Sequence, residues 1–352
     1  MAFSPAENEV WNLQKDLNDV VEQTASLWEK LNGAHFFITG GTGFIGCWLL
    51  ETLRHVQITG IARVEATVLT RNADAFRQSR PELAAFPGFD FVQGRVHDFE
   101  FPCASFTHIL HAATEPSNRY RGKPEELFDT VIDGTRRVLE LALRSGRPRV
   151  LILSSGAIYG MQPPGLERID ETCRSAPDCT EPGAAYAEVK RCAEMMAAVH
   201  AEYHDLPVVI ARIFTLIGPY MPLQEQFAAG NFLEDALAGS VVKVSGDGTA
   251  LRSFLYAADL VVWLLHLLQL GQSGRAYNVG SECAVSIGEL AQATAEIAGN
   301  RNYEILGTPI PGALPARYVP DTSRIRSELG VRECVSLKEA IYRSACWYKM
   351  SV

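Results

Sequence analysis

The most restrictive feature of the sequence is the stretch FFITGGTGFIG, residues 36 to 46. Four strand-forming residues lead into four glycines within seven positions, and a pattern of helical spacing follows. Gly40 can adopt a positive φ for a tight turn, Gly43 can let a ligand approach the backbone, and Gly46 can let the helix pack closely on the strand. Strand, turn and helix together predict a phosphate-binding turn that holds a dinucleotide, although a purely structural glycine turn would show the same letters.

The free N–H groups at the start of this helix are expected to face the phosphates of the dinucleotide. The residues that we expect to line this part of the cofactor site are Gly40, Gly43, Phe44, Ile45 and Gly46.

Short apolar segments alternate with helical patterns over the following part of the chain. Strands are predicted at 35–39, 66–70, 89–92, 108–111, 150–154 and 208–212, and helices at 44–55, 125–145 and 184–203. Short apolar strands that are separated by helices are buried on both faces, which indicates a Rossmann-type doubly wound parallel sheet of the α/β class. Ligands bind such sheets at the carboxyl ends of the strands.

The chain divides into three predicted regions. Residues 1–33 form a helical extension, in which one amphipathic helix is expected over 7–31 because apolar residues recur there at helical spacing. Residues 34–217 form the dinucleotide-binding domain, and residues 218–352 mainly form a smaller α/β lobe for the substrate, which can be interleaved with the first domain. The lobe is expected to contain helices at 231–238, 257–270 and 286–298. The proline-rich loop 160–183 is the best candidate for a lid.

Composition and charge exclude several function classes. The net charge is −9 and the basic residues are scattered, so we expect no nucleic-acid partner and no membrane partner. The longest apolar run, residues 260–270, is too short to span a bilayer, and the N-terminal residues lack the pattern of a signal peptide, which predicts a cytoplasmic protein. The eight cysteines form no CxxC pair, so we expect reduced thiols and no metal, with a Cys173–Cys179 disulfide as the weaker alternative.

Tyr186 and Lys190 stand four residues apart on the helix predicted at 184–203, so their side chains share one face. An ammonium group beside a phenol favours the phenolate, and we expect Lys190 to lower the pKa of Tyr186 toward the range of a general acid or base. A solvated helical pair is the alternative.

Several motifs in order along the chain carry a resemblance to a known family. They are GxxGxxG at 40–46, HAAT at 111–114, SSGAIYG at 154–160, YAEVK at 186–190, GDGTALRSFLYAADL at 246–260 and PDTSRIRSELG at 320–330. In order and spacing they resemble the extended short-chain dehydrogenase/reductase family, and within it the NAD(P)-dependent nucleotide-sugar epimerases, dehydratases and reductases. The resemblance covers residues 34 to 335.

The resemblance implies a catalytic set of Ser155, Tyr186 and Lys190. Tyr186 would exchange a proton with the sugar oxygen while a hydride moves between the sugar carbon and the nicotinamide, and Lys190 would hold the ribose hydroxyls. Ser155, with Ser154 as the neighbouring alternative, would donate a hydrogen bond to the substrate oxygen. Ala112 and Ala113 in HAAT would lie along the cofactor.

The end of the second predicted strand reads VLTRN, without the carboxylate that usually accepts from the 2′-hydroxyl of NAD. Arg71 could instead bind a 2′-phosphate, which favours NADP over NAD, with a plain solvated arginine as the alternative. Asp98 resembles the family residue that binds the adenine amino group, although an aspartate that caps a loop would look the same.

Gly156 and Ala157 occupy the positions at which the 4,6-dehydratases and sugar-acid decarboxylases of the family carry acidic residues. The sequence therefore favours a C4 epimerase or a 4-ketoreductase, with a dehydratase or decarboxylase as the alternative and a non-catalytic NAD(P)-binding sensor as the alternative of another class.

Thr130 and Thr215 replace asparagines that are usual in the galactose epimerases. The segment 226–237 with RSFLYAADL most resembles the CDP-abequose and CDP-paratose synthases, which are NADPH-dependent 4-ketoreductases.

The resemblance also implies contacts with a nucleotide-diphosphate sugar. Ser155, Asn231, Arg252 and Arg317 occupy positions like those of the family's substrate contacts, and arginine suits a diphosphate through bidentate pairing. A homodimer through the helices at 125–145 and 184–203 is expected on the same ground.

Overall fold

The computed structural model describes residues 11–113, 123–224, 227–298 and 301–350. At its centre lies a seven-stranded parallel sheet in the order β11-β6-β5-β4-β1-β2-β3. The strands are β1 (Ala34–Thr39), β2 (Val64–Thr70), β3 (Phe89–Gln93), β4 (His108–His111), β5 (Arg149–Ser155), β6 (Val208–Ile213) and β11 (Ala276–Val279). The predicted Rossmann-type sheet and its six predicted strands are confirmed. The strand order reverses between β1 and β4, which is where such sheets bind ligands.

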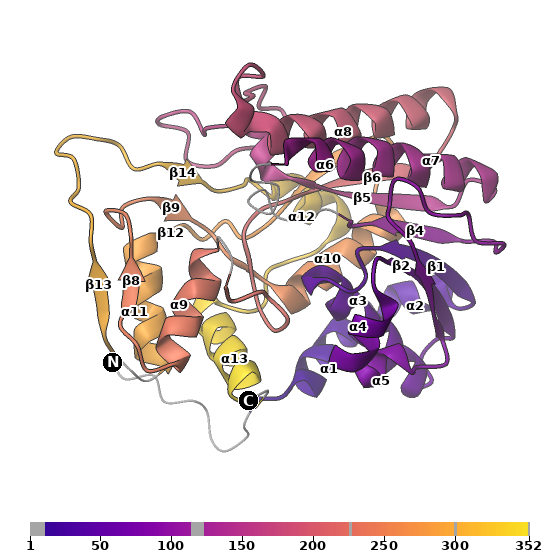
Figure 1. Ribbon diagram of the computed structural model, residues 1–352, viewed down its shortest axis with the longest axis horizontal. Helices are drawn as coiled ribbons and strands as arrows, with labels where there is room; N and C mark the ends of the chain where they lie inside the picture. The colour runs from indigo at the N-terminus through magenta and orange to yellow at the C-terminus, as the bar shows by residue number, and fades with distance from the viewer. Residues whose placement is uncertain (1–10, 114–122, 225–226, 299–300, 351–352) are drawn as a thin grey trace.

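Helices cover both faces of this sheet (Figure 1). One face carries α7 (Gly134–Arg144) and α8 (Ala185–Tyr203), with α6 (Pro124–Phe128) beside α8, and the other carries α3 (Phe44–Ile58) and α10 (Ala257–Leu270). Neighbouring residues of β1 alternate between the two faces: Phe37 belongs to the apolar cluster under α7 and α8, whereas Phe36 and Ile38 belong to the cluster under α3 and α10.

The N-terminal extension folds as two helices, α1 (Leu13–Gln23) and α2 (Ala25–Leu31). The prediction of one continuous helix over 7–31 is therefore wrong in this detail, and residues 7 to 10 lie outside the described ranges. The break falls at Thr24, whose hydroxyl donates to the carbonyl of Val20 at 2.6 Å. Asp16 is fully buried, accepts from the hydroxyl of Tyr256 at 2.5 Å and pairs with Arg343. These two contacts fix α1 to both the start of α10 and the C-terminal helix.

The smaller lobe contains three helices and several short strands. They are α9 (Ala228–Leu237), α11 (Ile287–Ala298), α13 (Leu337–Met350), β8 (Val242–Val244), β9 (Leu251–Arg252), β12 (Val285–Ser286), β13 (Tyr303–Ile305) and β14 (Arg317–Tyr318). The C-terminal part of the chain also returns to the large sheet, because β11 pairs with β6 and α10 packs on β5 and β6. The domain limits themselves stay a prediction.

The remaining elements are connections. They are α4 (Ala73–Ser79) and α5 (Pro81–Ala84) after β2, the π-helical turn η2 (Asp129–Asp133), the 3₁₀ turns η3 (Gly156–Tyr159) and η4 (Pro182–Ala184), β7 (Leu216–Ile217), β10 (Leu255–Tyr256) and α12 (Ser323–Leu329). The helix predicted at 125–145 is thus interrupted by η2. The loop 160–183 is anchored at Ile169, which exchanges backbone hydrogen bonds with Val319 and Asp321.

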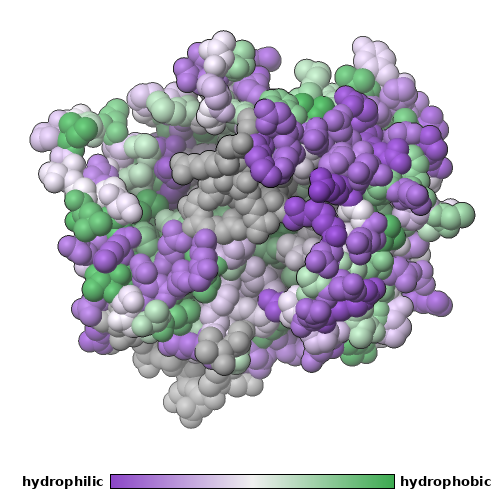
Figure 2. Space-filling model, in the orientation of Figure 1, coloured by the Kyte–Doolittle hydropathy of each residue, from purple (hydrophilic) through white to green (hydrophobic). Residues whose placement is uncertain are grey.

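The surface is mixed in character. Figure 2 shows polar side chains gathered over the side of α6 and α7, and apolar ones along the margin of the lobe. The segment after β13 has three exposed large apolar residues, Leu306, Ile310 and Leu314. Within the described ranges, none of the helices is long and apolar enough to cross a membrane. The cytoplasmic location stays a prediction.

Candidate active site

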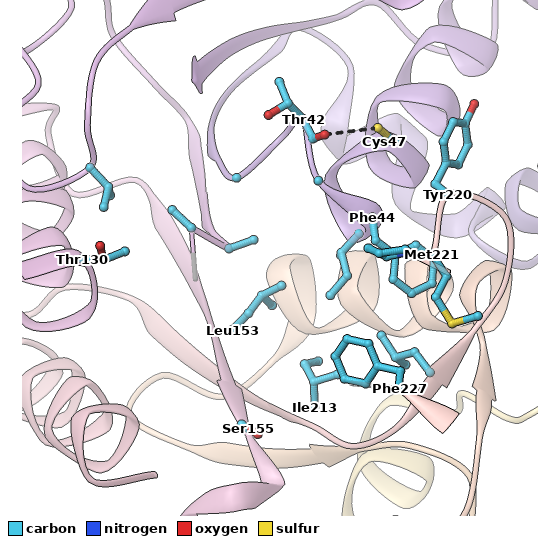
Figure 3. Close-up of a pocket in the computed structure, with 18 of the residues that line it drawn as sticks. Thr42, Phe44, Cys47, Thr130, Leu153, Ser155, Ile213, Tyr220, Met221 and Phe227 are labelled. Carbon is cyan, nitrogen blue, oxygen red and sulfur yellow. Dashed lines mark hydrogen bonds between the residues drawn. The ribbon is translucent and has the colours of Figure 1, made fainter. Parts of the chain in front are cut away.

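A large cavity of about 1490 Å³ opens at the carboxyl ends of the strands, between the sheet and the smaller lobe. Pockets for one small ligand usually measure about 300 to 1,000 Å³, so this cavity has room for two ligands side by side. Figure 3 shows Phe44, Met221 and Phe227 gathered on one side of it, with Leu153 and Ser155 along β5 and Thr130 farther across. Thr130 and Thr215, which replace the usual asparagines, both line its wall.

The glycine turn forms one end of the cavity and needs its glycines for steric reasons. Gly40 has a φ of +71°, and a Cβ there would lie 2.6 Å from the carbonyl oxygen of Ala112. A Cβ at Gly46 would lie 2.4 Å from backbone atoms of Gly40 and Gly41, so this glycine brings α3 against the turn. Gly40, Gly43, Phe44 and Ile45 line the cavity, whereas Gly46 supports the turn from beneath.

The start of α3 is well suited to an anion. Gly43 is its N-cap residue and, having no side chain, provides no side-chain cap. The N–H groups of the first turn therefore lack a side-chain acceptor from the cap and point toward the cavity with the positive end of the helix dipole. A backbone cradle that a Cβ would fill, followed by such a helix end, fits the pyrophosphate of a dinucleotide.

Thr39 and His111 hold the ends of β1 and β4 together beside this turn. The Thr39 hydroxyl accepts from the backbone N–H groups of Ala112 and Ala113 at 3.2 and 3.1 Å. The His111 ring is hydrogen bonded to Thr39 at 2.8 Å and to Thr135 at 3.2 Å. Ala112 and Ala113 line the cavity, as the sequence predicted. The wall beside the glycine turn is thus fixed by a buried histidine.

We expect this histidine to make the fold sensitive to acid. Burial, reinforced by Lys190, lowers the pKa of His111 from 6.5 to about 3. Below pH 6.5 the unfolded chain binds a proton at His111 and the folded protein does not, so the free energy of unfolding falls as the pH drops toward 3. Between pH 7 and 5, His111 should account for about 2 kcal/mol of this loss. In urea unfolding, the free energy of unfolding of His111→Gln should therefore fall by about 2 kcal/mol less between pH 7 and 5 than that of the parent. The control His108→Gln should still show the part of the fall that His111 causes. An unchanged pH dependence in His111→Gln would contradict the assignment.

Tyr186 and Lys190 lie on α8 and both line the cavity. The ammonium of Lys190 is buried and donates to the carbonyl of Leu153 on β5 at 2.7 Å. Burial lowers the pKa of Lys190 from 10.5 to about 8, and the nearby Glu194 opposes this shift. The lysine therefore remains mostly charged at neutral pH, one helical turn from Tyr186, where a cation stabilises a phenolate.

The structure distinguishes the two serines at the end of β5. Ser154 is buried and donates to the carboxylate of Glu194 at 2.5 Å. Arg212 binds the same carboxylate, with its closest contact at 2.7 Å, so Ser154 belongs to a buried ion-pair network. Both serines line the cavity, and the hydroxyl of Ser155 accepts from the N–H of Ala157 at 3.2 Å. Because the Ser154 proton is donated to Glu194, these contacts favour Ser155 as the group that faces a substrate.

The end of β2 carries positive charge and hydroxyl groups. Arg71 lies in the cavity wall, next to the hydroxyls of Thr42 and Thr70, which are 3.4 Å apart. Arg80, after α4, lies in the same wall with its guanidinium 5.1 Å from the ring centre of Tyr220. Asp98 also lines the cavity, and its carboxylate is 3.7 Å from the ring of His97.

The predicted substrate contacts divide into two groups. Arg252 on β9 lines the cavity together with Ser155. Asn231 lies on α9 with an exposed side chain and is not part of the wall, although Phe227 and Ala228 at the start of that helix are. Arg317 on β14 donates to the carbonyl of Glu167 at 3.2 Å and is likewise outside the wall. The roles of all three stay predictions.

Tyr318 and Phe214 are cavity residues that the sequence reasoning missed. Successive residues of a strand face opposite sides, so on β14 the wall position belongs to Tyr318 and its neighbour Arg317 faces away. A period-two pattern on a strand of two residues is too short to be recognised in the sequence. The signal that could have led to Tyr318 was its place next to Arg317, which was predicted to contact the substrate.

The chain is similar to known proteins in both sequence and fold. Residues 36–280 match the NAD dependent epimerase/dehydratase family. UDP-glucuronic acid decarboxylase 2 of Arabidopsis thaliana is 30% identical over 321 residues, which cover 89% of this chain and 67% of that protein. The dTDP-glucose 4,6-dehydratase of Streptomyces niveus is 27% identical over 319 residues, covering 89% of this chain and 92% of that protein.

Among solved structures, UDP-glucose 4-epimerase of Thermus thermophilus in complex with NAD superimposes with a TM-score of 0.73 and 26% identity, covering 90% of this chain and all of that chain. UDP-glucose 4-epimerase of Thermotoga maritima with UDP-glucose has the same fold, with a TM-score of 0.76, 22% identity, and coverage of 90% and 99%. The family match extends over more than half of the chain and contains the glycine turn, Ser155, Tyr186 and Lys190. The chain belongs to the NAD-dependent epimerase/dehydratase family of nucleotide-sugar enzymes, within the extended short-chain dehydrogenases/reductases.

Proposed function

We propose that this protein is an NAD(P)-dependent nucleotide-sugar oxidoreductase that acts at sugar C4, as a 4-ketoreductase or a C4 epimerase. The observation that carries this proposal is the gathering of Ser155, Tyr186 and Lys190 around one cavity with the glycine turn. The described carboxylates in the cavity wall are Asp98, Glu126 and Asp129, and they lie after β3, on α6 and on η2, not on β5 or in the η3 turn that follows Ser155. The chemistry supported near Ser155 is therefore proton and hydride transfer.

The protein residues divide this chemistry between them. Tyr186 gives a proton to the sugar oxygen during reduction, or takes it during oxidation, and Ser155 donates a hydrogen bond to the same oxygen. Lys190 supplies positive charge that favours the phenolate of Tyr186 and holds ribose hydroxyls of the cofactor. A dinucleotide whose pyrophosphate is held at the glycine turn would supply the nicotinamide that gives or accepts the hydride. A sugar that is bound in the cavity would lie between Tyr186 and Ser155, which both line it.

NADP is the cofactor that the charges at the end of β2 favour. The side chains of Arg71 and Arg80 and the hydroxyls of Thr42 and Thr70 lie in this part of the wall. A 2′-phosphate would find two cations there, whereas the carboxylate that usually binds the 2′-hydroxyl of NAD has no counterpart at the carboxyl end of β2. A preference for NADP in turn favours the 4-ketoreductase, which consumes reduced cofactor.

The cofactor preference predicts the behaviour of Arg71→Gln. This change should weaken NADPH binding by about tenfold or more and NADH binding by less than about threefold, because only NADPH carries the phosphate that Arg71 would bind. Titration of cofactor fluorescence measures both affinities. Arg63→Gln is the matched control, since Arg63 precedes the opposite end of β2 and pairs with Glu65 at 3.7 Å. If NADPH binding and NADH binding were weakened equally, Arg71 would not bind the 2′-phosphate.

Dehydration and decarboxylation are the alternative reactions, since relatives with those names match the chain. Both need an extra acid or base near the reacting carbons. Gly156 and Ala157 carry no carboxylate, and a Cβ at Gly156 would lie 2.6 Å from the hydroxyl of Tyr318. The space in which an acidic side chain could extend from position 156 is thus already filled.

The substrate proposed is a nucleotide-diphosphate sugar, whose diphosphate would be bound by Arg252, with Asn231 and Arg317 as further predicted contacts. The test is to incubate the protein with a panel of nucleotide sugars, including 4-keto-6-deoxy forms, and to follow reduced-nicotinamide absorbance and products. Stoichiometric consumption of NADPH by a ketosugar would support the 4-ketoreductase, and interconversion of isomers without net cofactor change would support the epimerase. Loss of carbon dioxide or water would support the alternative reactions. Cofactor binding without any turnover would favour a sensor.

We also infer that the protein is a homodimer through the helices α6, α7 and α8. On α8 the exposed residues Met195, Val199 and Tyr203 recur every four positions, and Phe128 at the end of α6 is also exposed. Such an apolar stripe on paired helices suits a second copy of the same helices in a four-helix interface.

Met195→Glu should convert this dimer to a monomer, because a carboxylate would be buried in the apolar interface without a partner. Sedimentation at micromolar concentration measures the change in mass. Met161→Glu is the matched control, because Met161 is 89% exposed in the loop after β5. If the unmodified protein already sediments as a monomer, the proposed homodimer is wrong.

A further inference from the structure

Strand β5 extends beyond β4 at the end that carries Ser155. β4 pairs with β5 only as far as Ile152, whereas β5 continues to Ser155 and pairs there with β6 alone. Beyond β4, the carbonyl of Leu153 accepts from the ammonium of Lys190 at 2.7 Å. Side chains therefore replace a neighbouring strand in holding the last residues of β5.

A largely buried ion pair adjoins these residues. Arg212 on β6 stands opposite Ser154 in the register of the two strands. Its guanidinium binds both carboxylate oxygens of Glu194 on α8, with the closest contact at 2.7 Å, and the same carboxylate accepts from the Ser154 hydroxyl at 2.5 Å. The side chains of Arg212 and Glu194 are only 14% and 11% exposed, and neither belongs to the cavity wall. The pair can therefore affect a substrate only through the residues that it holds.

Arg212 also contacts the chain after Ser155. Its Nη1 donates to the hydroxyl of Tyr159 in η3 at 2.7 Å, and that hydroxyl donates to the side-chain oxygen of Asn278 at 2.8 Å. Burial raises the pKa of Tyr159 to about 12, so its hydroxyl keeps the proton that the second of these bonds needs. Ser154 and Tyr159, one on each side of Ser155, are thus both hydrogen bonded to the same ion pair.

We propose that Glu194 and Arg212 are positioning residues that fix the segment 154–159 and thereby hold the Ser155 hydroxyl in the cavity wall. A hydrogen-bond donor contributes most to catalysis when it is already in place as charge develops on the substrate oxygen. An ion pair withdrawn from water adds little net stability, but its charged hydrogen bonds are directional and fix the groups that they join. The inference rests on the proposed function and adds to it two residues that act through Ser155.

Two small substitutions each remove one hydrogen bond to the ion pair and leave the pair itself in place. Ser154→Ala removes the hydroxyl that donates to Glu194, and Tyr159→Phe removes the hydroxyl that accepts from Arg212. Each should lower kcat by about tenfold and leave KM within about twofold, because Ser155 interacts most strongly with the substrate oxygen in the transition state. Steady-state kinetics measure both constants.

A double-mutant cycle shows whether these effects pass through Ser155. In a Ser155→Ala background, Ser154→Ala and Tyr159→Phe should each change kcat by less than about twofold, because the group being positioned is gone. Effects of the same size in both backgrounds, or a lower melting temperature with an unchanged kcat, would overturn the proposal. Tyr277→Phe is the matched control, because Tyr277 is also buried and its hydroxyl donates to Glu328 at 2.8 Å, outside the cavity wall. It should lower the melting temperature and leave kcat unchanged in both backgrounds.

A second measurement requires no turnover. In crystal structures, the Ser155 side chain should have one rotamer in the parent and should adopt a second rotamer, fully or in part, in Ser154→Ala and Tyr159→Phe. An unchanged rotamer in both variants would overturn the proposal. If the unmodified enzyme converted no nucleotide sugar, the proposed function would be wrong, and the rotamers would still decide whether the ion pair positions Ser155.

Discussion

Replacement of Tyr186 by phenylalanine should lower kcat by about 10³-fold, because it removes the group that exchanges a proton with the sugar oxygen. Tyr186 lies in the cavity wall, one helical turn from the buried ammonium of Lys190. Phenylalanine preserves the ring and therefore the packing of α8. The melting temperature and the cofactor affinity should change little, and the loss should be confined to the chemical step.

The matched control is Tyr303→Phe on β13. Tyr303 is exposed and does not line the cavity, so its hydroxyl should contribute nothing to turnover. Steady-state kinetics of both variants on the best substrate, with melting temperatures measured in parallel, separate chemistry from folding. A Tyr186→Phe enzyme that keeps more than about a tenth of the activity would show that another group transfers the proton.

The glycine turn should give the second large effect. Gly43→Ala should weaken cofactor binding by about 30-fold or more, because Gly43 lines the cavity where the backbone is expected to approach the pyrophosphate. Its stability should remain close to that of the parent, since a Cβ at Gly43 meets only the Gly40 oxygen at 3.4 Å and the φ of −89° suits any residue. Calorimetric titration with NADPH and NADH measures the affinity.

Two further variants show what Gly43→Ala reports. Gly46→Ala should lower the free energy of unfolding as well, because its Cβ would lie 2.4 Å from the backbone of Gly40. Gly246→Ala should change neither property, because a Cβ there has nothing within 4 Å. If Gly43→Ala bound cofactor as tightly as the parent, the turn would be structural and the dinucleotide would lie elsewhere.

Elements with strong local signals could be predicted from the sequence. Six strands of the sheet and the helix after the glycine turn were predicted close to their observed bounds. Each strand is a short apolar run, and the helix has apolar residues at helical spacing, so the local pattern is enough to predict them. The break at Thr24 was missed, since its cause is a side-chain hydrogen bond to Val20 within an unbroken apolar pattern. Strand β11 was also missed, because Ala276–Val279 is short and becomes a strand only through pairing with β6.

In the candidate site, too, residues with local sequence signals were predicted, and contacts between distant residues were not. Spacing along one helix was enough to place Tyr186 and Lys190 together, and the strand-turn-helix context was enough to place Gly40 and Gly43. The contacts that favour Ser155 over Ser154 could not be predicted, because Glu194 and Arg212, which hold Ser154, are distant from it in the sequence. Tyr318 was missed because its position depends on contacts across the cavity, with Gly156 and Phe214.

The fate of a deuterium label tests the central claim, hydride transfer at sugar C4, most directly. NADPH that carries deuterium at the transferable position would be supplied with a 4-ketosugar nucleotide, and a nucleotide sugar that carries deuterium at C4 would be supplied in a separate reaction. Hydride transfer at C4 predicts deuterium at C4 of the product in the first reaction if the enzyme is a ketoreductase. If it is an epimerase, deuterium should stay at C4 in the inverted product of the second reaction. Loss of the C4 label to water, or turnover in which no label enters or stays at C4, would contradict it.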